Sequence, residues 1–119
     1  MENGIADKSL RFAIRTVKLY QYLSEQKKEF VLSKQFLRSG TAIGALVREA
    51  EHAQSKADFL NKMNIALKEA NETLYWVILL RETAYLSEDE FQSIHNDAEE
   101  LVKILVSIVK TTKQKLNRI

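Results

Sequence analysis

The chain has 119 residues, of which 45% are hydrophobic and 29% are charged, a balance that gives one domain a core and excludes a disordered chain. It contains no cysteine, which excludes disulfide bonds, thiolate metal sites and a cysteine nucleophile. The formal net charge of +2 is too small to indicate a dedicated nucleic-acid-binding protein. Because no apolar run is long enough for a membrane span, we expect a cytoplasmic protein.

Helix-breaking residues are rare, because the sequence has no proline and only 3 glycines. This composition favours an all-α fold. Hydrophobic spacing and polar interruptions predict four helices, at about residues 5–26, 32–54, 56–85 and 88–117, in a single domain covering residues 1–119. Because short connections make consecutive helices antiparallel, we expect an antiparallel, up-down-up-down four-helix bundle.

The first two expected helices carry clear apolar faces. In the first, hydrophobic residues at spacings of three and four predict the side that packs into the core. These residues are Leu10, Ala13, Ile14, Val17 and Tyr20, and Phe12, Leu19 and Leu23 beside them make the face wide. In the second, Gly40 and Gly44 each cost about 1 kcal/mol relative to alanine inside a helix, so we predict that this helix packs closely against a neighbour.

The third and fourth expected helices begin with capping signals. Ser55 followed by Asp58 predicts the start of the third helix, and Ser87 followed by Glu90 forms a capping box at the start of the fourth. Behind these starts, helical spacing predicts two core stripes. They are Phe59, Met63, Ala66, Leu67, Ala70, Leu74, Val77 and Leu80, and then Phe91, Ile94, Ala98, Leu101, Leu105 and Ile108.

Both of these helices have more apolar surface than one bundle core needs. Residues 74–80 are seven consecutive apolar residues, which cover the whole circumference of a helix. A buried strand is the competing interpretation of this short run, although no glycine or proline bounds it. A wide core face is the simpler explanation, but we favour a homo-oligomer interface. The candidate interface residues are Tyr75, Trp76, Ile78, Leu79, Val102, Val106 and Val109.

Basic residues are concentrated in the first half of the chain. In the first helix they recur every three or four residues, which places them along one side where they could meet phosphates. A solvated helix face is the alternative. The candidate nucleic-acid-binding residues are Lys8, Arg11, Arg15, Lys18, Arg38, Arg48 and Lys56.

Signals for catalysis or metal binding are weak. Glu49 and His52 have the spacing of half a di-iron site, but the fourth helix supplies Gln92 with His95 and lacks the second carboxylate. Glu69 and Glu72 form an acidic pair, which Lys68 and Arg48 could neutralise. No nucleophile with a base and no phosphate-binding loop is present. We therefore expect a non-enzymatic protein without metal or cofactor.

Four segments together resemble the bacterial four helix bundle protein family. They read RSGTAIGA at residues 38–45, REA at 48–50, SKADF at 55–59 and IALKEANET at 65–73, followed by Tyr75 and Trp76. That family includes proteins encoded in intervening sequences of bacterial 23S rRNA genes, and it is related to the accessory variability determinant protein of diversity-generating retroelements. The resemblance implies a ring, commonly a homopentamer, and suggests RNA or DNA and a reverse transcriptase as partners by analogy.

The resemblance also implies roles for residues in these segments. Small and apolar members would pack between helices, and polar members would form salt bridges between subunits or contact phosphates. The packing members are Ser39, Gly40, Ile43, Gly44, Phe59, Ala66 and Ala70; the polar members are Arg38, Arg48, Glu49, Lys56, Asp58, Lys68, Glu69 and Glu72. The sequence therefore predicts a homo-oligomeric, nucleic-acid-binding or accessory assembly protein, with a protein-only self-assembling scaffold as the alternative.

Overall fold

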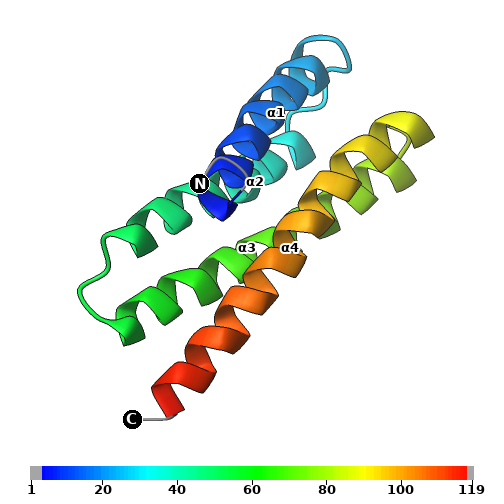
Figure 1. Ribbon diagram of the computed structural model, residues 1–119. Coiled ribbons are helices and arrows are strands. Elements are labelled where there is room, and N and C mark those ends of the chain that lie inside the picture. Colours follow the sequence, from blue (N-terminus) through cyan, green and yellow to red (C-terminus); the bar gives the residue numbers. More distant parts are fainter. Residues whose placement is uncertain (1–3, 118–119) are drawn as a thin grey trace.

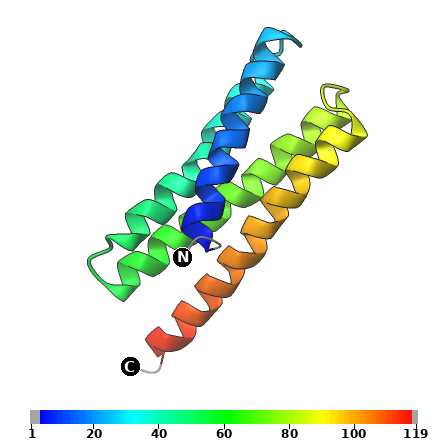
Figure 2. The same ribbon diagram turned by 45° about the horizontal axis from the view of Figure 1, so that its top comes forward.

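Four long α-helices make up the structure, a computed structural model that describes residues 4–117 (Figure 1). The helices are α1 (Ile5–Glu25), α2 (Leu32–Glu51), α3 (Lys56–Glu82) and α4 (Glu88–Asn117). Consecutive helices run antiparallel (Figure 2), which confirms the predicted all-α four-helix bundle. Within residues 4–117 there is no strand, so the apolar run at residues 74–80 is helical and lies inside α3.

Two helical hairpins, α1–α2 and α3–α4, form the bundle. α2 packs along α3 and joins the hairpins, whereas α1 touches α4 much less extensively (Figure 2). The bundle is elongated, with extents of 52 × 25 × 21 Å. The C-terminal turns of α4 reach beyond the start of α1 at one end (Figure 1).

The buried side of α1 differs from the predicted one. Its core residues are Ser9, Phe12, Thr16 and Leu23. Leu10, Ile14 and Val17, which the spacing placed in the core, are 60%, 48% and 40% exposed, so that part of the prediction is wrong. Phe12 and Leu23, which widened the predicted face, are buried. Two polar residues occupy core positions because their hydroxyls donate to backbone carbonyls within the helix, those of Ala6 and Phe12, and this removes the cost of burying them.

The predicted close approach of α2 is present. A Cβ atom added at Gly40 would lie 2.7 Å from both Cγ2 and Oγ1 of Thr16, and one added at Gly44 would lie 3.2 Å from the carbonyl oxygen of Ser9. Both contacts involve α1. The two glycines therefore allow the backbones of α1 and α2 to approach where any larger residue would push them apart.

Helix starts follow the predicted capping signals. The Ser55 hydroxyl accepts from the Asp58 amide at 3.0 Å. At α4, the Glu90 amide donates to the Ser87 hydroxyl at 3.2 Å, and the Ser87 amide donates to the Glu90 carboxylate at 2.8 Å. The start of α2 uses a residue that the sequence did not single out. The buried Glu29 carboxylate accepts the amides of residues 31, 32 and 33 at 3.0, 2.9 and 2.6 Å.

α3 ends at Glu82, three residues before the expected end at residue 85. Ala84 adopts φ 69°, in the left-handed region. Its amide donates to the Arg81 carbonyl at 2.9 Å, and the Tyr85 amide donates to the Leu80 carbonyl at 2.9 Å. This pair of bonds is a Schellman motif, which normally has glycine at the left-handed position. The sequence carries alanine there, so the usual signal for a helix end is missing.

Candidate assembly and nucleic-acid interfaces

Exposed apolar side chains lie on both helices of the α3–α4 hairpin. Tyr75, Ile78 and Val106 are 58%, 40% and 47% exposed. Trp76, Leu79 and Val102, from the same predicted interface, are half-buried. The Tyr75 ring packs edge-on against Trp76 with ring centroids 5.0 Å apart. The helices thus leave large apolar groups uncovered in the single chain, where they are a solubility liability.

Val109 is the exception among the predicted interface residues. It is only 6% exposed and belongs to the core cluster of its own chain. The buried stripe of α4 continues from Leu105 by four residues to Val109 rather than by three to Ile108, which is half-buried. Because both steps are compatible with a helical period of 3.6, spacing alone did not distinguish them. Val109 is therefore a core residue and not a contact for another subunit.

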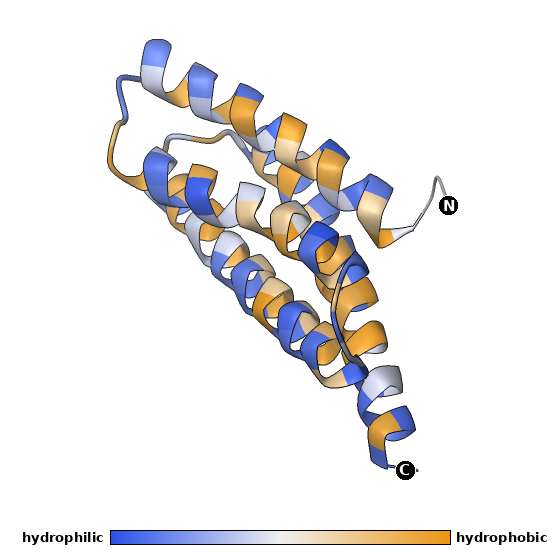
Figure 3. Ribbon diagram, turned by 90° about the vertical axis from the view of Figure 1, so that its left-hand side faces the viewer, coloured by the Kyte–Doolittle hydropathy of each residue, from blue (hydrophilic) through white to orange (hydrophobic). Residues whose placement is uncertain are grey.

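A second apolar surface lies on the outer side of the α1–α2 hairpin, where the sequence predicted none. A groove of about 690 Å³ runs between these helices, with small residues along much of its wall. Leu10 lines it, and Ile14 and Val17 continue the exposed apolar side of α1. Hydrophobic and hydrophilic residues alternate along all four helices (Figure 3), as in amphipathic helices. The groove residues are Ala6, Asp7, Leu10, Ala13, Thr41, Gly44, Ala45, Val47, Arg48 and Glu51.

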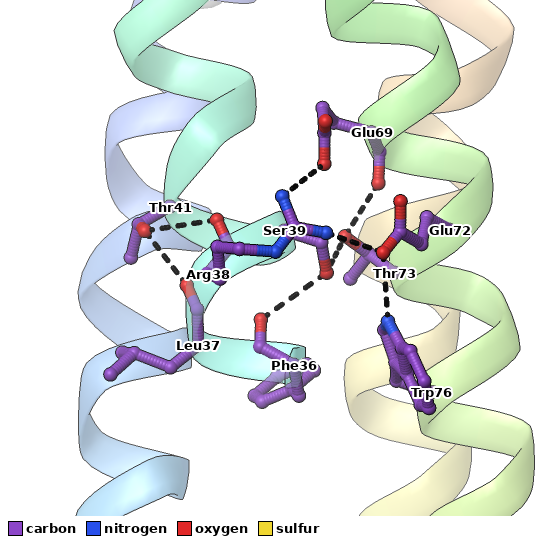
Figure 4. A network of polar contacts seen from close by, with 9 residues as sticks. All are labelled: Phe36, Leu37, Arg38, Ser39, Thr41, Glu69, Glu72, Thr73 and Trp76. Atoms are coloured by element: carbon purple, nitrogen blue, oxygen red, sulfur yellow. Dashed lines mark hydrogen bonds and ion pairs between the residues drawn. The ribbon is translucent and has the colours of Figure 1, made fainter. Parts of the chain in front are cut away.

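A polar network joins α2 to α3 (Figure 4). The Arg38 guanidinium binds Glu69 at 3.2 Å and also binds Glu72, whose carboxylate accepts from the Trp76 indole at 3.3 Å. The hydrogen bond to Glu72 and the charges of both carboxylates raise the pKa of Arg38 above its ordinary value, against the opposing effect of burial. Arg38, rather than Arg48 or Lys68, therefore neutralises the acidic pair.

Most basic residues of α1 are engaged within the chain. Lys8 binds Glu100 of α4, Arg15 binds Asp97 of α4, and the Nε of Arg11 lies 3.0 Å from Asp7. The ion pairs of Lys8 and Arg15 span the seam between α1 and α4, beside cavities of about 250 and 340 Å³. These two side chains therefore act first as cross-links between helices. The basic stripe that the sequence predicted is only partly available for phosphates.

The remaining basic candidates have no such partner. Lys18, Arg48 and Lys56 are exposed and form no ion pair with any residue between 4 and 117. Arg48 lines the α1–α2 groove, whereas Lys18 and Lys56 do not. Arg11 keeps 70% of its side chain exposed despite its pairing. Arg11, Lys18 and Lys56 are therefore the members of the predicted set best placed to meet a phosphate backbone.

α4 separates its charges along its length. All acidic residues of this helix lie between 88 and 100, and all its lysines lie between 103 and 115. The acidic half pairs with Arg81, Arg15 and Lys8, while the lysines form no ion pair within the described part of the chain. The two ends of the α3–α4 hairpin thus carry opposite charge.

The described residues offer no obvious metal centre. Glu49 pairs with Lys62 at 3.1 Å, and His95 stacks on Phe91 with ring centroids 4.8 Å apart. Across residues 4–117 no three histidine, cysteine or acidic side chains come together as a metal site would require. In the same region, no helix combines the length and apolar character needed to cross a bilayer.

Known proteins resemble this chain over nearly its whole length. The model of the 23S rRNA-intervening sequence protein family matches residues 1–107. A crystal structure of a protein with unknown function from the S23 ribosomal protein family of Bacteroides thetaiotaomicron VPI-5482 is 60% identical, with a TM-score of 0.88, and the match covers 89% of this chain and 95% of that one. No curated protein matches the chain significantly. Neither the name of this family nor that of the crystallised protein indicates an enzymatic activity.

Proposed function

Because the chain belongs to the 23S rRNA-intervening sequence protein family, we propose that it is a non-enzymatic, homo-oligomeric helical bundle of the cytoplasm that binds nucleic acid through its basic surface. The family resemblance implies a pentamer. It also implies a protein partner acting on the same nucleic acid, such as a reverse transcriptase. The proposal therefore has two parts, self-association and binding to structured RNA or DNA.

Exposed apolar side chains on both hairpins support the proposed self-association. Leu10 and Tyr75 are 60% and 58% exposed, on α1 and α3 respectively. Burying a side chain of this size is worth about 1.5 to 3 kcal/mol. Several such residues on each hairpin supply enough free energy to offset the entropic cost of bringing copies together. Self-association thus gives these surfaces a role that a single bundle does not.

Exposed cations without internal partners support the second part. Lys18 and Lys56 form no ion pair with another described residue, and Arg11 projects into solvent. A symmetric oligomer repeats each of these charges in every subunit, so a modest charge per chain becomes a multivalent surface. Binding of this kind is electrostatic and therefore weakens steeply as salt is added.

A salt-titrated binding assay with duplex and single-stranded RNA and DNA tests the second part. We expect measurable affinity at low salt and a linear fall of log K with log salt concentration. The variant Arg11→Gln/Lys18→Gln should reduce the slope by up to about two for each subunit that engages a duplex, since each phosphate contact contributes roughly 0.9. The control Lys27→Gln/Lys115→Gln removes the same charge elsewhere and should leave the slope nearly unchanged.

A protein-only scaffold is the second candidate, because Lys8, Arg15 and Arg38 are already paired with acids of the same chain. Under this alternative the remaining charges only keep the assembly soluble. An oligomer that fails to bind any of the four nucleic acids at low salt would reject the nucleic-acid part and support the scaffold. Binding that responds equally to both double variants would reject the assigned residues while keeping the function.

A further inference from the structure

We propose that the connection between α1 and α2 binds unpaired nucleotides, with the Phe30 ring stacking on a base and Lys28 and Lys34 contacting the neighbouring phosphates. We call residues 26–31, which connect the two helices, the tip turn. This contact rests on the proposed nucleic-acid binding and gives that function a preference for single strands over duplexes.

The tip turn exposes two large apolar side chains. Phe30 and Val31 are 52% and 72% exposed, whereas the other large exposed hydrophobic residues of the described chain all lie within helices. The turn lies at one end of the bundle and apart from the α3–α4 turn (Figure 1 and Figure 2). The single chain therefore leaves an aromatic ring in water at this end, where it is open to a ligand.

Hydrogen bonds on both sides of Phe30 hold the tip turn in one conformation. The Glu29 amide donates to the Leu23 carbonyl at 3.0 Å, and the Val31 amide donates to the Glu29 carboxylate at 3.0 Å. The buried Ser33 hydroxyl donates to the Glu29 carbonyl at 2.7 Å. Because the backbone is already fixed on either side of the ring, little conformational entropy is lost when a ligand covers it.

Two lysines flank the exposed ring. Lys28 lies in the tip turn and Lys34 in the first turn of α2, and both are exposed without an ion pair to another residue of the described chain. Lys27 is also exposed, but its ammonium lies 5.9 Å from the centre of the Tyr22 ring of α1. An aromatic ring between free lysines matches a base between phosphates, which is the composition of a single-strand contact.

The acids near the tip turn leave this positive charge in place. The Glu29 carboxylate is buried and accepts three backbone amides at the start of α2, so the positive end of that helix offsets its charge. Glu25, the last residue of α1, is exposed. The acidic first turn of α4 belongs to the other hairpin, where Arg81 binds Glu88. A strand that reaches the tip turn from the α1–α2 side therefore meets mainly lysines.

Stacking on Phe30 requires a base whose face is free. Neighbouring pairs cover the faces of the bases inside a duplex, so the ring can reach only a single strand, a loop or a bulge. Every base has such a face, and we therefore expect little preference for base sequence. A lipid surface fits the turn less well, because a basic element needs more buried apolar area than two side chains for stable membrane binding.

Substitutions of Phe30 test stacking against simple apolar contact. Phe30→Ala should weaken binding of an oligouridylate strand by about five- to hundredfold, as the loss of one stacked ring does, and binding of a blunt RNA duplex by less than about twofold. Phe30→Leu keeps an apolar side chain without a ring, so it should bind the strand nearly as weakly as Phe30→Ala. Phe30→Trp should bind at least as tightly as the wild type. Each variant should keep the wild-type helical circular dichroism, because position 30 is more than half exposed.

Substitution of the flanking lysines tests the phosphate contacts. Lys28→Gln/Lys34→Gln should lower the salt slope of oligouridylate binding by up to about 1.4 for each tip turn engaged, since each single-strand phosphate contributes roughly 0.7. The control Lys110→Gln/Lys115→Gln removes the same charge from α4 and should leave this slope nearly unchanged. Equal slopes for the two double variants would reject the assigned phosphate contacts.

Other outcomes separate failure of this contact from failure of the proposed function. If the wild type binds neither single strands nor duplexes at low salt, both are rejected. If it binds them but Phe30→Ala leaves oligouridylate affinity unchanged, nucleic-acid binding stands and the tip contact is rejected. Binding of the Phe30→Leu variant at wild-type strength would reject stacking. A Phe30→Ala variant with an altered molar mass in solution would identify the tip turn as a contact between protein chains and overturn the assigned ligand.

Discussion

The close contact of α1 with α2 at Gly40 gives a sharp test of how the bundle is packed. Replacing Gly40 by alanine has two opposing effects. The alanine removes the conformational freedom of glycine in the unfolded chain and improves helix propensity, which together stabilise the fold by about 1 kcal/mol. The new Cβ, however, would lie 2.7 Å from two atoms of Thr16, well inside the 3.5–4.0 Å at which carbon atoms pack favourably.

The steric effect should exceed the propensity effect. Thr16 is fully buried, and its hydroxyl donates to the Phe12 carbonyl at 2.9 Å. The side chain can make room only by rotating away from that bond or by moving α1, and overpacking of this kind typically costs 1 to 3 kcal/mol. We therefore expect Gly40→Ala to lower the free energy of unfolding by up to about 2 kcal/mol.

A double-mutant cycle isolates the contact from helix propensity. In a Thr16→Ala background both atoms that lie 2.7 Å from the new Cβ are absent, and only the Cβ of residue 16 remains, at 3.3 Å. Gly40→Ala should then become neutral or stabilising by at most about 1 kcal/mol. Urea unfolding of the four proteins should then give a coupling energy of about 1 to 3 kcal/mol between the two positions. A coupling energy near zero, or a Gly40→Ala variant that is more stable than the wild type, would refute this description of the α1–α2 contact.

Two further substitutions test the helix termini. Burial raises the pKa of Glu29, but the hydrogen bonds from backbone amides lower it by more, so the pKa lies below its ordinary value. The ionised Glu29 carboxylate therefore stabilises the fold at neutral pH, and this stabilisation is lost as the pH falls below about 4. Glu29→Gln should lower the free energy of unfolding by about 1 to 2 kcal/mol at pH 7, and urea unfolding at lower pH should show a smaller difference from the wild type. A difference independent of pH would contradict the capping role of the Glu29 carboxylate. Ala84→Gly should raise stability by about 1 kcal/mol in urea unfolding, because Ala84 has positive φ; an unchanged midpoint would contradict the Schellman assignment.

Helix number and most of the core could be predicted from the sequence because these properties depend on local signals. The capping residues Ser55 and Ser87 mark helix starts by bonding to amides three residues away. The end of α3 was placed too late since Ala84 occupies a position where glycine is the usual marker. Local chemistry predicts structure well where the residue type is characteristic of the conformation, and fails where tertiary packing holds an unusual residue in place.

The rotation of α1 could not be obtained from hydrophobic spacing. Two apolar sides compete on this helix, one through Leu10, Ile14 and Val17 and the other through Phe12 and Leu23. The second side also contains Thr16, whose hydroxyl donates to the Phe12 carbonyl of the same helix and whose side chain fits against Gly40. Thr16 can therefore be buried with this side. A count of apolar residues ranks a threonine as polar and so selects the wrong side.

This rotation also explains why only half of the candidate interface was predicted. The exposed residues of α3 and α4 were recognised because they exceed what one core can bury. Those of α1 were assigned to the core, and the α1–α2 groove was therefore missed. The partners of charged residues could not be predicted either. Arg38 of α2 binds Glu69 and Glu72 of α3, and the sequence does not reveal the register of one helix against the other.

The molar mass of the wild-type chain in solution tests the central claim most directly. Sedimentation equilibrium across a range of concentrations and salt should give a multiple of the 13.7 kDa chain mass, five-fold if the pentamer implied by the family resemblance forms. The assembly should persist in high salt, because buried apolar groups rather than charges supply most of its stability. A single species of 13.7 kDa at every concentration would show that the exposed apolar side chains of α1 and α3 remain in water, and would contradict the proposed self-association.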